Sequence, residues 1–369
     1  MLNILRLVRL SIMPAALVFY SGQGWAESWQ QAGSARFSTE YDSNPAMYPA
    51  YQVGIWRSMF EPSYQLKRTG DANELNAGVA LQIARSSNTT QSRNREDPSG
   101  FLDWKRQGDA GEFGLSAKYD EVATRIAELD NAGPFSVDST RASRTMSGSW
   151  SKALSERSTL LADGSYQGVS YRGGPYVNYA NETAGLKLSY AWSEYSTPFL
   201  RVSNVKYVPA DGGPSSSLAS ATLGWNWKVA DYLEGTLQAG ESRSSTAQMS
   251  TQGAVEVKYA AQRTVLVLNA NRQVTPSGLG GFVAADQANG SWSYALSERS
   301  NTGIDLGWRK SHFITDMISS STGAWLQREL NSFWVVRTNY LHKTSEQDGF
   351  GRASSNILGI AFVYTHTDF

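Results

Sequence analysis

One short stretch of the chain occurs twice: GSWSKALSERST at residues 148–159 returns as GSWSYALSERSN at residues 290–301. A shorter relative, LSYAWSEYST, lies at residues 188–197. Each copy joins an alternating stretch of residues to a short polar turn and then to a second alternating stretch. Recurrence of one unit along a chain indicates a structure assembled from similar units. The repeat therefore predicts a series of β-hairpins.

Hydrophobic residues alternate with polar or small residues on both sides of these turns and elsewhere, as at 74–83, 112–120, 219–228 and 303–309. Such alternation gives a strand one apolar and one polar face. A soluble β-sandwich also alternates, but its strands average about 5–6 residues, whereas those expected here run to about 10–14. The apolar faces often end in Trp or Tyr, and the polar faces are rich in Gly and Ser. These features favour a transmembrane barrel with a wet lumen.

The expected connections alternate in length, as short periplasmic turns and longer external loops do in outer-membrane barrels. The sequence thus predicts an all-β, antiparallel, up-and-down transmembrane β-barrel of about 18 strands, with 16 as the alternative. Longer loops are expected at 43–50, 87–97, 121–140, 172–177, 209–215, 244–248, 275–284 and 345–352. The expected strands are 31–42, 51–67, 73–86, 98–106, 111–120, 141–152, 157–171, 178–192, 197–208, 216–228, 232–243, 249–260, 263–274, 285–296, 300–312, 315–327, 332–344 and 354–367.

Residues 1–26 have the pattern of a cleaved signal peptide. Arg6 and Arg9 precede a short apolar run, and Gly24 and Ala26 supply small residues before the expected cleavage point. An uncleaved anchor is the alternative, although the apolar run is shorter than a spanning helix. We therefore expect residues 27–369 to form the barrel, in the bacterial outer membrane.

Composition narrows the class of partner. The chain has 33 basic and 33 acidic residues, and this balance argues against a nucleic-acid partner. It has no cysteine, so an exported protein of this size needs an extensive hydrogen-bonded scaffold or a large core. The 12 Trp and 18 Tyr suit the aromatic girdles where a barrel meets lipid headgroups. Outer-membrane lipid is thus the first expected partner.

The last expected strand is ILGIAFVYTHTDF, and it ends on Phe369. A terminal aromatic residue is typical of barrels that are folded by the outer-membrane assembly machinery, which is a second expected partner. The apolar face of this strand, which includes Leu358 and Phe362, is out of phase with Phe369. A bulge or a frayed end would account for the mismatch.

Three segments together resemble a known family. They are YDSNP at 41–45, TRIAELDNAGPFSVDSTRASR at 124–144, and the repeated LSERS turns. They are similar to the β-barrel porin family found with exosortase/PEP-CTERM and exopolysaccharide gene clusters. The resemblance covers nearly the whole mature chain. It implies an outer-membrane exit pore for a secreted polysaccharide, and it carries no catalytic motif.

Catalytic, cofactor and metal sites are not predicted. An enzyme at the barrel rim would need a catalytic dyad or triad, and only His312, His342 and His366 are available. None lies in a recognisable motif with Ser and Asp, and cysteine ligands are absent. His312 and His342 share strand parity with Trp308 and Tyr340, so we expect their side chains to face outward.

The polar strand faces supply the candidate pore-lining residues. Their mixed signs suit a neutral or weakly charged hydrophilic solute, although charges inside a barrel also pair across strands for purely structural reasons. The candidates are Glu74, Glu112, Lys118, Asp120, Asp163, Lys187, Glu256, Lys258, Asp305, Arg309 and Arg337.

Three functions remain open on the sequence: an exit channel for exopolysaccharide, a general small-solute porin, and a structural or adhesive barrel with a plugged lumen. The loop at 121–140 is the longest expected, and it either narrows the pore or caps it. A periplasmic polysaccharide-export protein is a further expected partner. It would dock on the short turns that carry Glu156, Arg157, Glu194, Glu298 and Arg299.

Overall fold

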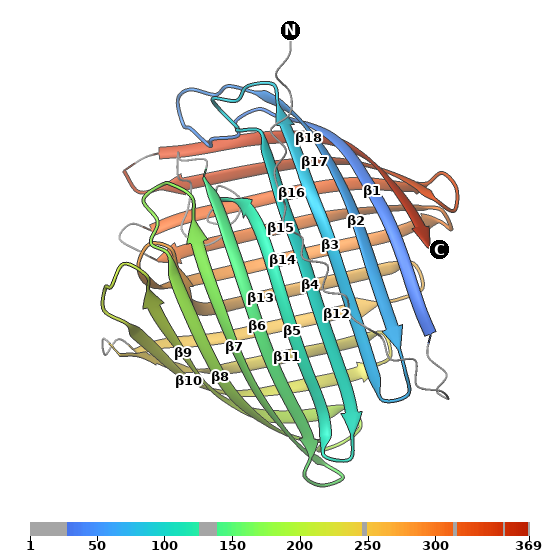
Figure 1. Cartoon of the computed structure of the whole chain (residues 1–369), viewed down its shortest axis with the longest axis vertical. Helices are drawn as coiled ribbons and strands as arrows, with labels where there is room; N and C mark the ends of the chain where they lie inside the picture. The colour runs from blue at the N-terminus through green and yellow to red at the C-terminus, as the bar shows by residue number, and fades with distance from the viewer. Residues whose placement is uncertain (1–27, 125–138, 246–248, 313–315, 350, 368–369) are drawn as a thin grey trace, which may run out of the picture.

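The strands of the described residues form one closed antiparallel sheet of 18 strands, in which each strand pairs with its neighbours in sequence (Figure 1). The structure, a computed structural model, describes residues 28–124, 139–245, 249–312, 316–349 and 351–367. The strands are β1 Ser28–Asp42, β2 Ile55–Thr69, β3 Asn73–Ser86, β4 Arg95–Gly108, β5 Gly111–Ala123, β6 Thr140–Ala153, β7 Ser158–Tyr171, β8 Tyr179–Tyr190, β9 Ser196–Pro209, β10 Ser216–Ala230, β11 Leu233–Ser244, β12 Met249–Ala260, β13 Thr264–Ser277, β14 Gly281–Ser297, β15 Ser300–His312, β16 Asp316–Glu329, β17 Trp334–Gln347 and β18 Gly351–Thr367.

The barrel closes where β1 pairs with β18, from Ala32 opposite Thr367 to Asp42 opposite Ile357. Closure satisfies the backbone groups that the edges of an open sheet would expose, which is what a lipid environment requires. The start of β1 and the end of β18 lie at the same rim (Figure 1). The short turns lie at this rim too, and we call it the short-turn rim; the opposite one is the loop rim.

The predicted strand count and order are confirmed, and the architecture is the expected one. The expected signal peptide and Phe369 lie outside the described residues. No helix among the described residues is long and apolar enough to cross a membrane.

The repeated stretch forms β6 and its turn in one copy, and β14 and its turn in the other. In the first turn, Leu154 and Ser155 donate backbone hydrogen bonds to the carbonyl of Ser158, at 2.8 and 3.3 Å. The Ser155 hydroxyl accepts one from the Ser158 backbone, at 3.1 Å. Local serine bonds of this kind favour a tight turn over continued strand, which explains why the LSERS sequence recurs at this rim.

Another turn at the short-turn rim, between β10 and β11, carries an ion pair. Lys228 at the end of β10 lies 2.7 Å from Asp231, which is almost fully exposed in the β10–β11 turn. The hydrogen bond from Lys228, and then its charge, hold the pKa of the Asp231 carboxyl below its ordinary value. Water screens so exposed a pair, so it contributes little to the stability of the barrel.

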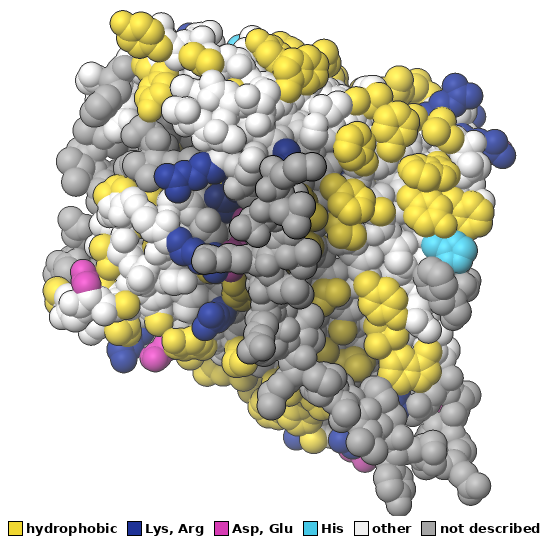
Figure 2. All heavy atoms as spheres, turned by 45° about the horizontal axis from the view of Figure 1, so that its top comes forward, with side chains coloured by type: hydrophobic (Ala, Val, Ile, Leu, Met, Phe, Trp, Pro, Cys, Tyr) yellow, Lys and Arg dark blue, Asp and Glu magenta, His cyan; other side chains and the backbone are white. Residues whose placement is uncertain are grey.

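The outer wall is apolar. Phe37 on β1 is opposite both Phe60 on β2 and Phe362 on β18, and all three rings are exposed. Leu223 on β10 and Val79 on β3 also point away from the lumen, and they are 68% and 63% exposed. Figure 2 shows hydrophobic side chains spread over the wall at the right of the view. Exposed apolar side chains all around a closed barrel form the lipid-facing belt of a transmembrane protein.

Two of the expected loops are wrong. Strands β13 and β14 continue through the expected loop 275–284 and pair as far as Ser277 opposite Gly281. The expected loop at 345–352 is also mostly strand: β17 runs to Gln347 rather than to 344, and β18 starts at Gly351 rather than at 354. Prolines and glycines in these stretches suggested loops. Instead, Gly280 and Gly281 take φ values of 93° and 140°, which allow a tight hairpin.

Candidate functional site

The side chains that alternate along each strand with those of the lipid-facing belt point into the barrel lumen. The strand registers place all eleven candidate residues on this inward face, for example Lys118 on β5, whose neighbours Ala117 and Tyr119 face outward. Whether solutes contact them is a separate question of function. The eleven are Glu74, Glu112, Lys118, Asp120, Asp163, Lys187, Glu256, Lys258, Asp305, Arg309 and Arg337.

Several of these candidates are paired. Glu74 lies 2.9 Å from Lys67 on β2, and Lys258 lies 2.9 Å from Glu234 on β11. Lys118 and Asp120, on one face of β5, lie 3.6 Å apart. Lys67 and Glu234 are inward-facing charges that the sequence did not single out. All three pairs neutralise part of the lumen charge, and the first two also tie adjacent strands together.

Asp163 and Arg201 form a pair that skips a strand. The Arg201 guanidinium lies 2.9 Å from Asp163, although β9 and β7 are separated by β8. On the intervening strand, Gly185 is opposite Asp163 on β7 and opposite Ser203, two residues from Arg201, on β9. A Cβ at Gly185 would lie 2.8 Å from Arg201 and 2.9 Å from Asp163, so only glycine leaves room for this contact. Gly185 is therefore required for the Asp163–Arg201 ion pair to cross β8.

Three aromatic side chains face the lumen and were missed by the sequence reading. Phe101 on β4 lies over Gly78, Phe199 on β9 over Gly224, and Trp325 on β16 over Gly303. A Cβ at Gly78 or Gly303 would lie 2.5 Å from the ring that covers it. An aromatic at polar-face parity, opposite a glycine on the adjacent strand, is the sequence signal that could have identified them.

Two of these rings hold a cation. The Lys187 ammonium lies 4.0 Å from the centre of the Phe199 ring, and the Arg337 guanidinium lies 4.4 Å from that of Trp325. Both distances are within the range of cation–π attraction. Among the described residues neither cation has a carboxylate within 4 Å. Each therefore keeps its positive charge available to the lumen.

At the loop rim, the tip of the β13–β14 hairpin (residues 273–283) leaves the wall. Pairing between β12 and β13 stops at Gly253 opposite Arg272, whereas β13 and β14 pair up to Ser277. Above Arg272, β13 is thus an edge strand. Pro276 is tolerated here because its missing N–H has no strand to bond on that side.

The tip contacts the wall at β7–β9, beyond the intervening strands β10–β12. The backbone N–H of Val177, between β7 and β8, donates to the carbonyl of Gly278 at 2.8 Å. The Tyr207 hydroxyl on β9 donates to the carbonyl of Ser277 at 3.4 Å. The rings of Tyr207 and Phe282 lie 6.1 Å apart. Since β9 and β13 are not sheet neighbours, the hairpin bridges the mouth of the barrel.

A cluster of tyrosines receives the tip. Tyr171 stacks on Tyr176 at 4.7 Å, and Tyr179 lies 5.0 Å from Tyr207. Tyr171, Tyr179 and Tyr207 are each less than 10% exposed, although they sit at the inward mouth of a barrel. This buried cluster makes the bridge a packed contact. On the far side of the bridge, against β9–β12, lies a cavity of about 950 Å³, whose lining includes Pro209, Leu218, Ser250 and Val274.

The segment between β1 and β2 also turns inward. The Asn44 amide donates to the carbonyls of Tyr48 and Ser354, at 2.9 and 3.0 Å, and its oxygen accepts from Tyr48 N–H at 3.1 Å. Asn44 is only 1% exposed. Met47, with φ of 52°, is carried to the inner wall of β14–β17. The YDSNP stretch contains this clamp, but the sequence reading used it only for the family resemblance.

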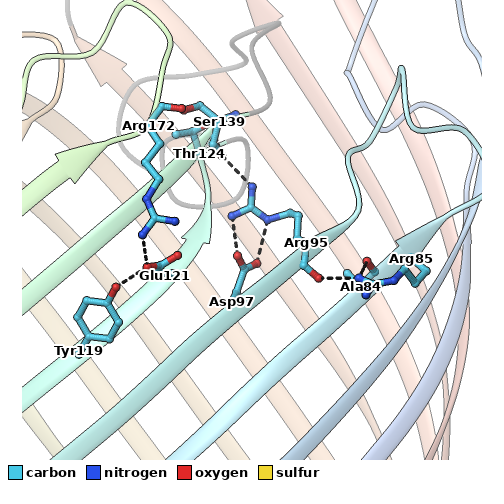
Figure 3. A network of polar contacts seen from close by, with 9 residues as sticks. All are labelled: Ala84, Arg85, Arg95, Asp97, Tyr119, Glu121, Thr124, Ser139 and Arg172. Carbon is cyan, nitrogen blue, oxygen red and sulfur yellow. Dashed lines mark hydrogen bonds and ion pairs between the residues drawn. The ribbon is translucent and has the colours of Figure 1, made fainter. Parts of the chain in front are cut away.

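The long loop expected at 121–140, to narrow the pore or to cap it, lies largely outside the described residues, but its two ends are described (Figure 3). The backbone N–H of Thr124 donates to the carbonyl of Ser139 at 2.9 Å, and Ser139 N–H donates to the Thr124 hydroxyl at 3.0 Å. Arg95, held by Asp97 at 2.8 Å, donates to the same Ser139 carbonyl at 3.0 Å. The ends of this segment are therefore fixed side by side at the loop rim.

The outer face at the loop rim is charged, which the sequence reading did not anticipate. Glu121 faces outward and bonds to the Tyr119 hydroxyl and to Arg172 (Figure 3). His312, which faces outward as expected, lies 3.0 Å from Asp286 and 3.1 Å from Asp316. Among the described residues no group of three or more His, Cys, Asp or Glu is arranged to hold a metal ion. This rim is a network of ion pairs above the apolar belt.

Comparisons with known proteins identify the fold. No family model matches the chain, and no curated protein matches it. Among solved structures, the outer membrane protein OpdK from Pseudomonas aeruginosa matches with a TM-score of 0.53 and 10% identity, over 92% of this chain and 99% of that one. OccAB4 from Acinetobacter baumannii matches with a TM-score of 0.52 and 8% identity, over 92% and 98%.

The chain has the fold of an outer-membrane porin. A further match, the structure of OpdK with vanillate, has a TM-score of 0.51 and 11% identity, over 92% of this chain and 99% of that one. Identities this low show the architecture alone. With the apolar belt and the closed sheet, that architecture places the chain in the bacterial outer membrane. The short-turn rim then lies on the periplasmic side of the membrane, and the loop rim lies on the extracellular side.

Proposed function

We propose that this barrel is a passive channel for small hydrophilic solutes. The observation that carries the proposal is the charged mid-lumen of both signs, below a mouth that the β13–β14 tip divides in two. A barrel of 18 strands leaves an aqueous channel unless something fills it. The tip does not fill the lumen; it limits the width of what enters. Solute would move by diffusion, and selectivity would come from lumen charges that have no ion-pair partner among the described residues, such as Lys187 and Glu256.

An exit channel for exopolysaccharide is the second candidate, and it stands on the family resemblance. The inward rings of Phe101, Phe199 and Trp325 favour it, because flat apolar rings pack against the faces of sugars. The bridge at the mouth weighs against it, since a polymer would have to displace the tip from its tyrosine cluster. A periplasmic export protein would then dock on the short turns, at Glu156, Arg157, Glu194, Glu298 and Arg299.

Two measurements separate these readings. In planar lipid bilayers, the purified barrel should open stable ion channels without any added ligand. A barrel that inserts but never conducts would contradict both channel readings and favour the plugged, structural one. Deletion of the gene then distinguishes the channels: slower uptake of small solutes with normal surface polysaccharide supports the small-solute porin. Loss of surface polysaccharide with normal uptake would support the exit channel instead.

A further inference from the structure

The wall of the barrel has a gap between β12 and β13 on the side of the loop rim. The register of this pair ends at Gly253 opposite Arg272, although β12 begins at Met249 and β13 continues to Ser277. The start of β12 stays in the wall, because it pairs with β11 as far as Met249. The end of β13 instead pairs with β14 and follows the tip across the mouth. The two strands therefore separate above Arg272, and no strand of the described residues closes the space between them.

The separation turns the lipid-facing side of the β13–β14 hairpin towards the lumen. Trp292 and Phe282 lie on the same side of β14, and Trp292 is exposed on the outer wall. At the tip, however, the ring of Phe282 lies 6.1 Å from that of Tyr207, whose side chain points inward from β9. Tyr207 is only 2% exposed, so this contact is closely packed. The side of the hairpin that belongs to the outer wall thus continues into the mouth of the barrel.

The cavity of about 950 Å³ lies along this turned side, between the tip and the inner wall of β9–β12. Part of its lining comes from residues on the lipid-facing side of their strands, namely Met249, Val274, Phe282 and Ala284. Another part comes from residues on the lumen side of theirs, such as Tyr207, Leu218 and Ser250. A cavity lined by both sides of the sheet has to reach through the wall, and the gap between β12 and β13 is where the strands leave room for it.

The described lining favours an apolar occupant. At the gap it consists of side chains such as Met249, which is 66% exposed, and Val274. Asp211 is the one carboxylate among the described lining residues, and it accepts a hydrogen bond from the backbone N–H of Gly213 at 3.0 Å. The His312 ring is held between two carboxylates, at 3.0 and 3.1 Å. These polar groups already have partners within the protein, whereas the apolar surface gains free energy when an apolar ligand covers it.

Ion pairs lie on the outer wall where the gap begins. Arg272 lies 3.7 Å from Asp286, and Lys310 lies 2.8 Å from Asp316. Further down the same side of β13, Leu268 is 47% exposed in the lipid-facing belt. The outer entrance of the gap is therefore at the boundary between lipid headgroups and acyl chains. A molecule with a polar head and an apolar chain can leave its head at this boundary while its chain enters the cavity.

We propose that the gap between residues 249–252 and 273–277 is a lateral portal, through which one apolar chain of an outer-leaflet amphiphile enters the cavity. The chain would lie along Met249, Val274 and Phe282, and the headgroup would stay on the outer wall near Arg272. The inference is carried by the continuity of the cavity lining with the lipid-facing belt. It goes beyond the proposed channel, because passage of hydrophilic solutes needs no exchange between the mouth and the membrane.

The test is photolabelling of the full-length barrel in lipid vesicles, with a stearic acid that carries a diazirine at the middle of its chain. Mass spectrometry should find labels at 249–252 and 274–284, and also on the belt, at residues such as Leu223. Excess unlabelled stearic acid should suppress the labels at the portal far more than those on the belt, because only the portal is a saturable site. Ser250→Trp, which fills the cavity, should lower portal labelling about tenfold, the change expected when a chain loses the burial of two methylenes. Ser165→Trp, the matched substitution on the inner wall of β7, should leave portal labelling unchanged.

Portal labelling that resists competition would overturn the proposal, as would equal portal labelling in wild type and Ser250→Trp. A short, water-soluble carboxylic acid with the same diazirine should not label the portal preferentially; if it does, the cavity is a water-filled vestibule and the proposal is wrong. Conductance in planar bilayers keeps the two proposals apart. Competed labelling of a barrel that never conducts supports the portal and contradicts the channel, whereas conduction without such labelling contradicts the portal and keeps the channel. Native migration of each variant on a gel, before and after heating, controls for folding.

Discussion

Replacing Gly278 with alanine should release the β13–β14 tip from the mouth. A Cβ at this position would lie 2.6 Å from Cζ of Tyr171 and 2.9 Å from Cε2. Tyr171 cannot retreat easily, because it is 9% exposed and stacked on Tyr176 at 4.7 Å. The added methyl therefore has to displace either the tyrosine cluster or the tip, and the tip is held by fewer contacts.

The magnitude follows from those contacts. The Val177–Gly278 backbone bond contributes about 1 kcal/mol net, and the Tyr207–Phe282 pair contributes about 1 kcal/mol beyond area burial. A docking free energy of about 2 kcal/mol leaves roughly 3% of tips undocked. Overpacking by one methyl costs about 1–3 kcal/mol. The substitution should therefore bring the docked and undocked populations close to equality.

Single-channel recording in planar bilayers is the assay. Wild type should show one main conductance with rare excursions to a larger one, and Gly278→Ala should occupy the larger level about half the time. Gly108→Ala is the matched control, because a Cβ there meets nothing nearer than 3.8 Å. Identical traces for Gly278→Ala and wild type would refute the bridge.

A cross-link gives the converse experiment, since the chain has no cysteine of its own. A Cβ at Gly280 would lie 4.0 Å from Cγ2 of Val177. Oxidised Val177→Cys/Gly280→Cys should lock the smaller conductance, and a reducing agent should restore the excursions. Gly280→Cys alone is the control for the strain that a side chain meets at a φ of 93°. A reducing agent without effect on the oxidised variant would likewise contradict a movable tip.

The other predictions concern the wall, the clamp and the lumen. Leu223→Arg should lower the free energy of unfolding in lipid vesicles by about 2–4 kcal/mol, measured by urea titration, because its side chain faces lipid. Thr222→Arg, whose side chain faces the lumen, should lower it far less. Asn44→Ala removes three part-buried hydrogen bonds and about 2–4 kcal/mol of local stability. Limited proteolysis should therefore cut residues 43–54 faster in the variant than in wild type, while the barrel resists. Equal cleavage rates in the variant and wild type would argue against the clamp. Lys187→Gln should shift the reversal potential in a salt gradient toward cation preference, and Glu256→Gln should shift it the opposite way; shifts of the same sign would exclude these two residues from the conducting path.

Local alternation made the strands predictable. A residue such as Leu223 shows its face through its immediate neighbours, since the side-chain period of a strand is two. The same rule assigns Asp163 and Lys187 to the inward face from the sequence alone. Strand ends were less predictable, as at 275–284, because glycine and proline mark both loops and tight hairpins. Only pairing with a specific partner distinguishes the two.

The mouth and the cavities of the inner wall depend on contacts that no local pattern encodes. Gly278, in the turn between β13 and β14, and Tyr171, at the end of β7, are far apart in sequence, and their strands are not sheet neighbours. Arg309 and Lys343 line one cavity of the inner wall only because the barrel register sets β15 and β17 at matching levels. Asn44 is an ordinary turn residue in the sequence, and its bond to β18 exists only because the sheet closes.

The sequence alone determined an 18-stranded outer-membrane barrel, the face of each strand and the mixed charge of its lumen. These follow from a period-two pattern and from hairpins whose turns are written in adjacent residues. The tertiary structure alone decided that one hairpin leaves the wall to bridge the mouth, and that Phe101, Phe199 and Trp325 lie on glycines inside the lumen. Those features arise from closure and register, which bring together residues far apart in the chain.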